Sequence, residues 1–189
     1  EPIQSTFGDR YLDENFLKDI QNICNKKNIP LIFDEIQTGF YTSGKKWYFQ
    51  QIGVSPDIVI FGKKSQVSGI MVKKKFSEIF NDEFLLNVTW NSDLIDMYRS
   101  NLIINYLERN NLTRQIRKYS KDISNYLRKF KILKNVRSSG YLIAFDLDSP
   151  KFRDLLVKKL FENGMLVNPT RFNTVRLRPR LNTSLKEIS

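Results

Sequence analysis

The sequence predicts an α/β protein, and three observations lead to that class. Two short apolar runs, at 31–33 and 57–61, are followed directly by polar or glycine residues. Such runs are typical of parallel strands that are covered on both faces, and helical or loop segments separate them. The chain after residue 95 alternates helices with short strands. We therefore expect part of a large parallel-sheet domain over residues 1–95. A connecting helix and a smaller C-terminal α+β domain are expected over residues 96–189.

The N-terminal portion is expected to hold one helix and three strands. Residues 12–27 carry apolar side chains at helical spacing, and the Asn-x-Pro that follows ends the pattern. The first apolar run closes on Asp34, and the second closes on Gly62-Lys63. A third strand is expected over residues 67–72.

The C-terminal portion is expected to begin with two long helices. Apolar residues recur at helical spacing over residues 93–109 and again over residues 112–130. One more helix and three short strands are then expected, in the order strand 141–147, helix 150–162, strand 165–167 and strand 175–178.

The composition excludes several kinds of site. The 189 residues include no histidine and a single cysteine, Cys24, so a His-based triad, a histidine metal site and an intrachain disulfide are all excluded. Cys24 is expected to be a buried, inert thiol. No apolar run approaches the roughly 18 residues that span a membrane, and we expect a cytoplasmic protein. The chain begins at Glu1 and stops partway through a predicted helix, so we expect a piece of a longer protein.

The formal net charge of +11 raises the alternative of a basic nucleic-acid-binding domain. All of the excess positive charge lies after residue 100, where Tyr119, Tyr126 and Phe130 alternate with basic residues. These aromatic side chains fall on the apolar face of the second long helix, which favours core packing over base stacking. We therefore expect no nucleic-acid partner, and we expect the lysines at 73–75 to form a solvated turn.

Two charged residues fall where ligands gather in an open parallel sheet, at the carboxyl ends of the strands. These are Asp34 and Lys63. An amine just beyond a buried strand loses hydration, which favours its neutral, nucleophilic form and its condensation with an aldehyde. A carboxylate opposite it suits the protonated pyridine nitrogen of pyridoxal phosphate. On their own, such residues more often cap a turn and face solvent.

A longer set of motifs resembles a single family. DEIQTGF at 34–40, Gly44, GVSPDI at 53–58 and FGK at 61–63 resemble the signature of class III pyridoxal-phosphate aminotransferases, which have fold type I. EPIQ at 1–4, Thr89-Trp90 and VRLRP at 175–179 resemble the same family in the same order. Within the class, FGKKSQVSG at 61–69 is most similar to the lysine 6-aminotransferase branch, as are Thr42 and Trp90. The resemblance covers the C-terminal half of the family's length.

The resemblance implies a role for each of five residues. Lys63 would form the internal aldimine with pyridoxal 5'-phosphate and move the proton between substrate and cofactor. Asp34 would pair with the pyridinium nitrogen, and Gln37 would lie against the ring and its phenolic oxygen. Thr89 would reach the cofactor phosphate of the neighbouring subunit, so the active form would be a homodimer. Arg176 would bind a carboxylate of the substrate or of 2-oxoglutarate.

The implied reaction moves the terminal amino group of L-lysine, or of a similar basic amino acid, to 2-oxoglutarate. The full-length parent would catalyse it, and this piece alone would be inactive. Three positions depart from the family pattern. Thr6 stands where many members have a glutamate that masks the substrate arginine, Asn91-Ser92 replace a glycine pair, and Arg180 replaces a proline. These departures keep an inactive homologue open as the alternative.

Overall fold

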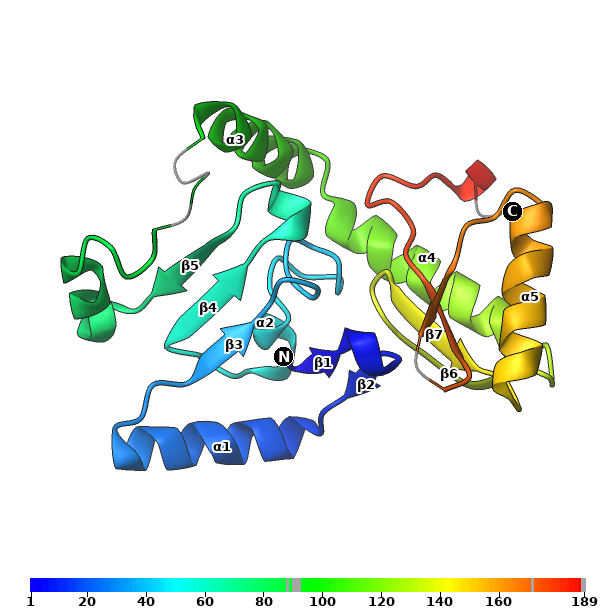
Figure 1. The fold of residues 1–189 in the computed structure, drawn as a ribbon, viewed down its shortest axis with the longest axis horizontal. Helices are drawn as coiled ribbons and strands as arrows, with labels where there is room; N and C mark the ends of the chain where they lie inside the picture. Colours follow the sequence, from blue (N-terminus) through cyan, green and yellow to red (C-terminus); the bar gives the residue numbers. More distant parts are fainter. Residues whose placement is uncertain (88, 90–92, 171, 188–189) are drawn as a thin grey trace.

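The computed structural model describes residues 1–87, 89, 93–170 and 172–187, which form two groups of elements (Figure 1). The N-terminal group comprises β1 (Ile3–Gln4), β2 (Arg10–Tyr11), α1 (Glu14–Lys27), β3 (Ile32–Asp34), α2 (Phe49–Ile52), β4 (Ile58–Phe61) and β5 (Gly69–Val72). The C-terminal group comprises α3 (Leu94–Arg109), α4 (Leu112–Leu127), β6 (Lys134–Ser139), β7 (Leu142–Asp146), α5 (Pro150–Glu162), β8 (Asn168–Thr170) and β9 (Thr174–Leu177). Short 3-10 helices lie at Ser5–Phe7 (η1), Lys63–Ser65 (η2), Lys74–Asn81 (η3) and Leu185–Glu187 (η4).

The N-terminal sheet has the strand order β3-β4-β5. β3 pairs in parallel with β4, as predicted, and Asp34 lies opposite Ile60 in that register. β5 is antiparallel to β4 instead of continuing the parallel sheet. The reason is the length of the connection, because a parallel return needs a crossover of a dozen or more residues. Only residues 62–68 separate β4 from β5.

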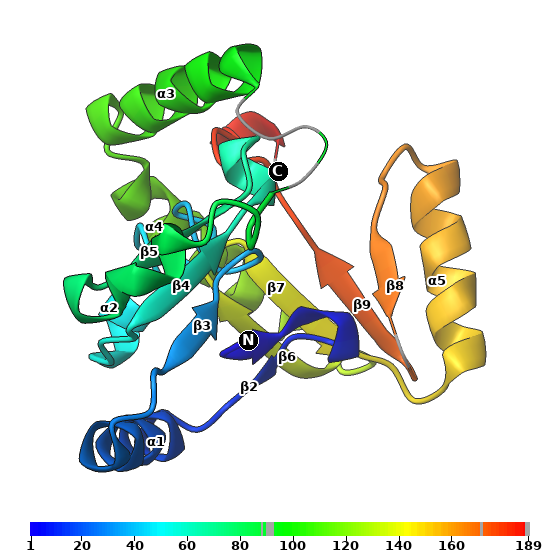
Figure 2. The same ribbon diagram turned by 60° about the vertical axis from the view of Figure 1, so that its left-hand side comes forward.

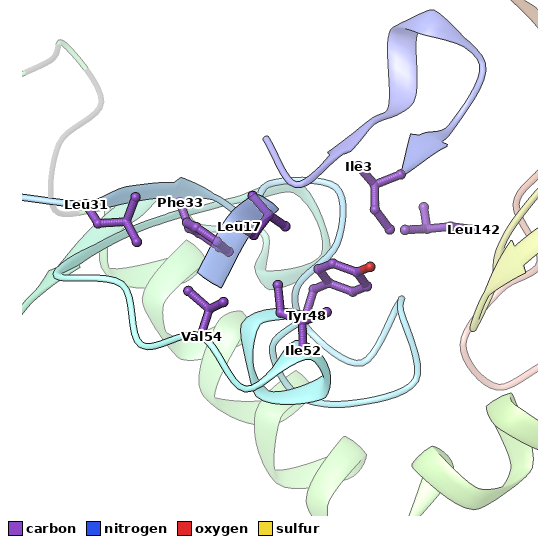
Figure 3. Close-up of a cluster of buried hydrophobic side chains, with 8 residues drawn as sticks. All are labelled: Ile3, Leu17, Leu31, Phe33, Tyr48, Ile52, Val54 and Leu142. Carbon is purple, nitrogen blue, oxygen red and sulfur yellow. The ribbon is translucent and has the colours of Figure 1, made fainter. Parts of the chain in front are cut away.

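One apolar cluster joins the N-terminal group to the C-terminal group (Figure 3). It contains Leu17 of α1, Phe33 of β3 and Ile52 of α2, and it extends through Ile3 to Leu142 of β7. Cys24 packs against this cluster but is only half-buried, so the predicted full burial of its thiol was wrong. The cluster places the β1–β2 hairpin between the two sheets (Figure 1).

The C-terminal sheet is antiparallel throughout, with the order β6-β7-β9-β8 (Figure 2). α4 packs against β6, and α5 packs against β8 and β9. α5 spans the residues that the sequence predicted, because Ser149 Oγ caps its start by accepting a hydrogen bond from Phe152 N, and Pro150 occupies its first turn. β6 was not predicted, and the strand expected at 165–167 is found at Asn168–Thr170.

The expectation that Tyr126 and Phe130 belong to the core was wrong, whereas the lysines at 73–75 are exposed, as expected, at the start of η3. Tyr126 is 59% exposed and Phe130 is 44% exposed. The two rings contact each other edge to face, so they do not belong to the core. At 73–75, Lys73 and Lys75 both form ion pairs with the buried carboxylate of Asp57, because that carboxylate needs a cationic partner. Within the described ranges, no helix is long and apolar enough to cross a membrane.

Candidate functional site

The candidate site lies at the carboxyl ends of β3 and β4. Asp34 is the last residue of β3, and Lys63 follows β4 by two positions, so the parallel register carries both to the same edge of the sheet. Asp34 Oδ1 accepts a hydrogen bond from Ile36 N at 2.9 Å. Oδ2 has no hydrogen-bond partner among the residues described here, which leaves it available to a ligand.

Lys63 has a left-handed backbone, with φ of 55°. This conformation costs a residue with a side chain roughly 1–2 kcal/mol and is found most often where function requires it. Gln66 holds the turn, since its backbone N and its Nε2 donate to Lys63 O at 2.9 and 3.0 Å. The Lys63 side chain is exposed, so the predicted loss of hydration is not met in this chain, where no described residue covers the amine.

Glu35 organises the loop that carries Gln37. Its carboxylate is 1% exposed and accepts hydrogen bonds from Thr38 Oγ1 at 2.7 Å, Tyr48 N at 2.9 Å and Phe49 N at 2.8 Å. Burial raises the pKa of Glu35 above its usual value, although these three hydrogen bonds oppose the rise. Gln37 is half-buried within the loop, one residue before Thr38. The sequence analysis gave Glu35 no role, although the residue lies inside the DEIQTGF motif.

Arg176 occupies β9, in the other sheet. Its Nη1 donates to Ser5 O at 2.7 Å, and its buried Nε has no hydrogen-bond partner. Burial lowers the pKa of Arg176, the charge of Arg178 lowers it further, and Asp9 opposes both effects. No carboxylate in the described chain forms an ion pair with Arg176. A half-buried guanidinium with an unused N–H is suited to an incoming carboxylate.

Asp9 and Arg178 form a buried pair beside Arg176. Asp9 is fully buried, and its Oδ1 lies 2.5 Å from Arg178 Nη2. Asp9 Oδ2 is also buried and has no hydrogen-bond partner. The pKa of Lys64 is lowered mainly by burial and secondly by the positive charge of Arg178. The charge of Arg178, which follows β9, is therefore felt at the residue next to Lys63.

The remaining predicted residue is Thr89. Thr89 is exposed, and no contact in the described chain links it to Asp34 or Lys63. Trp90 and the Asn91-Ser92 replacement lie outside the described residues. Of the other departures, Thr6 is exposed and follows Ser5 directly, while Arg180 forms an ion pair with Glu187.

The residues present fit a pyridoxal group. Asp34 offers a free carboxylate oxygen to a pyridinium N–H, and Lys63 lies at the same sheet edge with an amine that makes no hydrogen bond or ion pair to any described residue. The described residues contain no group of three or more His, Cys, Asp or Glu side chains that could hold a metal ion. A free carboxylate oxygen and an exposed amine at one sheet edge are groups that suit an organic aldehyde cofactor with a basic ring nitrogen.

The sequence pattern of the family described as Aminotransferase class-III matches residues 1–189. The chain belongs to the class III aminotransferases. Members of this class use pyridoxal phosphate, which agrees with the predicted cofactor. The predicted family and fold class are both confirmed.

Relatives of this class III aminotransferase carry three different substrate names. The chain is 35% identical over 197 residues to L-lysine-epsilon aminotransferase of Mycobacterium tuberculosis, covering 100% of this chain and 44% of the relative. It is 33% identical to 4-aminobutyrate aminotransferase of Kluyveromyces lactis, covering 96% and 40%. It is 31% identical to ornithine aminotransferase of Oceanobacillus iheyensis, covering 96% and 46%.

The fold of this class III aminotransferase is also found in solved structures. Lysine aminotransferase from M. tuberculosis in the internal aldimine form superposes with a TM-score of 0.91 at 34% identity, covering 100% of this chain and 45% of that chain. Ornithine aminotransferase from Toxoplasma gondii superposes with a TM-score of 0.89 at 27% identity, covering 98% and 46%. The chain spans less than half the length of each of the relatives and structures named here.

Proposed function

We propose that the protein to which this chain belongs transfers the terminal amino group of L-lysine, or of a similar basic amino acid, to 2-oxoglutarate. The observation that carries the proposal is the register of β3 and β4, which puts Asp34 and Lys63 at one sheet edge within a class III aminotransferase. The likeness to L-lysine-epsilon aminotransferases supports the choice of donor.

Each proposed residue would act on a stated part of the cofactor or the substrate. When bound, pyridoxal phosphate supplies an aldehyde for the substrate amine and a ring that accepts electrons. Asp34 Oδ2 would hold the proton on the ring nitrogen, because a carboxylate there favours the charged form. Lys63 Nζ would provide the covalent attachment point and carry the proton that moves during transfer. Gln37 would contact the ring, and Thr89 would bind the phosphate.

Arg176 would fix the orientation of the substrate by binding its carboxylate. A guanidinium can donate two parallel N–H bonds to a carboxylate, which sets direction as well as affinity. Its unpartnered Nε and its lack of a described acidic partner support this role. Thr6 cannot mask Arg176 with a negative charge, so we propose that a carboxylate-bearing substrate finds this arginine open in both halves of the exchange.

We also propose a cytoplasmic homodimer. Large apolar side chains of α3 are exposed, including Leu94 at 79%, Ile95 at 70% and Tyr98 at 68%. Such a patch requires a covering surface, and a second subunit or the rest of the parent chain would supply it. We retain residues 1–95 and 96–189 as parts of two domains, since their sheets are separate. The half-buried free thiol of Cys24 fits a reducing compartment.

The test is an amine-donor assay on the full-length protein with pyridoxal phosphate and 2-oxoglutarate. L-lysine, L-ornithine and 4-aminobutyrate are compared by kcat/KM, since a methylene step changes the free energy by about 1–3 kcal/mol. We expect L-lysine to be preferred and Lys63→Ala to abolish turnover. Failure of all three donors in a folded, cofactor-loaded protein would favour the inactive-homologue alternative.

A further inference from the structure

A basic cleft lies between α4, β6 and the loop that follows β3. It has a volume of about 430 Å³, within the range of small-molecule sites. α4 runs along β6 at this place (Figure 1). Asp34, Lys63 and Arg176 do not line the cleft, so it is separate from the candidate site. Its lining residues are Ser43, Gln51, Arg117, Ser120, Lys121, Ser124, Arg128, Ser138, Ser139 and Gly140.

The positive charge of the cleft comes from one face of α4. Arg117, Lys121 and Arg128 lie on the same side of the helix, because three- and four-residue steps connect them through Ser124. The acidic residue of this helix, Asp122, does not line the cleft, and neither does any other described acidic side chain. An uncompensated group of three cations attracts an anion.

Much of the donor capacity of these cations is unused. Arg117 Nε donates to Gly44 O at 2.8 Å, which fixes the guanidinium while its two Nη groups make no hydrogen bond to a described residue. Lys121 Nζ likewise has no described partner. Arg128 is held more fully, since Nη1 donates to Asn125 Oδ1 at 3.2 Å and Nη2 donates to Val136 O at 3.3 Å.

A buried hydroxyl at the floor of the cleft is also unpartnered. Ser43 is 1% exposed, and its Oγ makes no hydrogen bond. A buried hydroxyl without a partner costs free energy, and a ligand that accepts from it would remove that cost. The floor around it is fixed, because Gln51 Nε2 and Ser139 Oγ both donate to Ser43 O, at 2.7 and 3.1 Å. Ser124 Oγ donates to Ser138 Oγ at 2.8 Å.

We propose that this cleft binds a small anion that carries a diphosphate group. Guanidinium, ammonium and hydroxyl donors converge on it, and a diphosphate offers more acceptor oxygens and more charge than a single carboxylate. Arg117 and Lys121 would bind the phosphate oxygens, and Ser43 would donate from the floor. The site is independent of the proposed transamination.

The test is calorimetric titration of the full-length protein with inorganic pyrophosphate. The protein is first saturated with pyridoxal phosphate, so that the phosphate site of the cofactor is filled. Citrate serves as a polycarboxylate probe of similar charge. Lys121→Ala and Arg117→Ala remove cleft cations, and Lys118→Ala is the matched control. Lys118 is on the same helix but lines a different hollow, with Arg114 and Tyr119.

We expect pyrophosphate to bind at one site per chain, with about tenfold weaker affinity in Lys121→Ala and unchanged affinity in Lys118→Ala. Lys121 is exposed, so its loss should leave the fold intact. Lys121→Glu provides a second variant, in which binding should be lost. The proposal is overturned if pyrophosphate fails to bind, if citrate binds as tightly, or if Lys118→Ala weakens binding as much as Lys121→Ala does.

Discussion

Replacing Asp9 with asparagine removes a buried negative charge without changing the size of the side chain. Asp9 is fully buried, and it pairs at 2.5 Å with Arg178, whose side chain is 19% exposed. The substitution leaves Arg178 and Arg176 as two cations that lie two residues apart at the end of β9. Removing one partner of a buried ion pair costs about 3–5 kcal/mol, because the other charge stays uncompensated. We expect Asp9→Asn to lower the free energy of unfolding by that amount.

Urea unfolding of the full-length protein, followed by tryptophan fluorescence, measures this loss. The control is Glu108→Gln, which breaks the pair between Glu108 and Lys46, whose side chains are 47% and 40% exposed. Exposed pairs contribute about 0–1 kcal/mol. A loss of stability in Asp9→Asn no greater than in Glu108→Gln would refute the reasoning.

Three further predictions concern single residues. Arg176→Lys should raise the KM for the oxo acid about tenfold or more in steady-state assays with a smaller effect on kcat, since lysine lacks the paired N–H groups; an unchanged KM would count against its role. The pKa of Asp57 lies below its usual value. Burial alone would raise that pKa, but the hydrogen bond from Leu31 N and the interactions with Lys75 and Lys73 outweigh burial. The folded-state pKa is then below the unfolded one, so this stability is present above about pH 4 and is lost as the pH falls through the folded value. Asp57→Asn should reduce the loss of unfolding free energy as the pH falls, measured by urea titrations at several pH values. The same pH dependence in the variant and in the original protein would contradict this prediction. Gly140→Ala should lower the melting temperature more than Gly164→Ala does. Both glycines have positive φ, but a Cβ at Gly140 would clash with the backbone of residues 42–44, whereas a Cβ at Gly164 meets nothing within 4 Å.

The sequence allowed the fold to be predicted wherever burial and capping follow from local pattern. The apolar run that ends at Asp34 became β3, and the Ser149-Pro150 start of α5 was placed correctly. β6 was not predicted because its residues, KNVRSS, are mostly polar and show no strand pattern. It is a strand because it pairs with β7, and that pairing cannot be read from its own composition. Tyr126 shows the opposite error, since helical spacing placed it on the apolar face of α4, of which Ile116 is buried while Tyr126 is 59% exposed.

In the candidate site, too, the residues that follow from local pattern were predicted and those that depend on distant contacts were not. Strand ends suggested Asp34 and Lys63, and their shared sheet edge needed only the parallel pairing of neighbouring strands. Asp9 and Arg178 could not be paired from sequence, because 169 positions separate them and only the folded hairpin brings them together. Glu35 could have been found, as a charged residue inside an otherwise uncharged stretch after Asp34, but its role depends on the path of the loop around it.

The central claim is that Lys63 carries the cofactor. Borohydride reduction of the full-length protein with pyridoxal phosphate, followed by peptide mass mapping, tests it most directly. We expect a phosphopyridoxyl group on Lys63 and none on the neighbouring Lys64, which is half-buried. A folded protein that shows no adduct, or one that carries the adduct on another residue, would contradict the account.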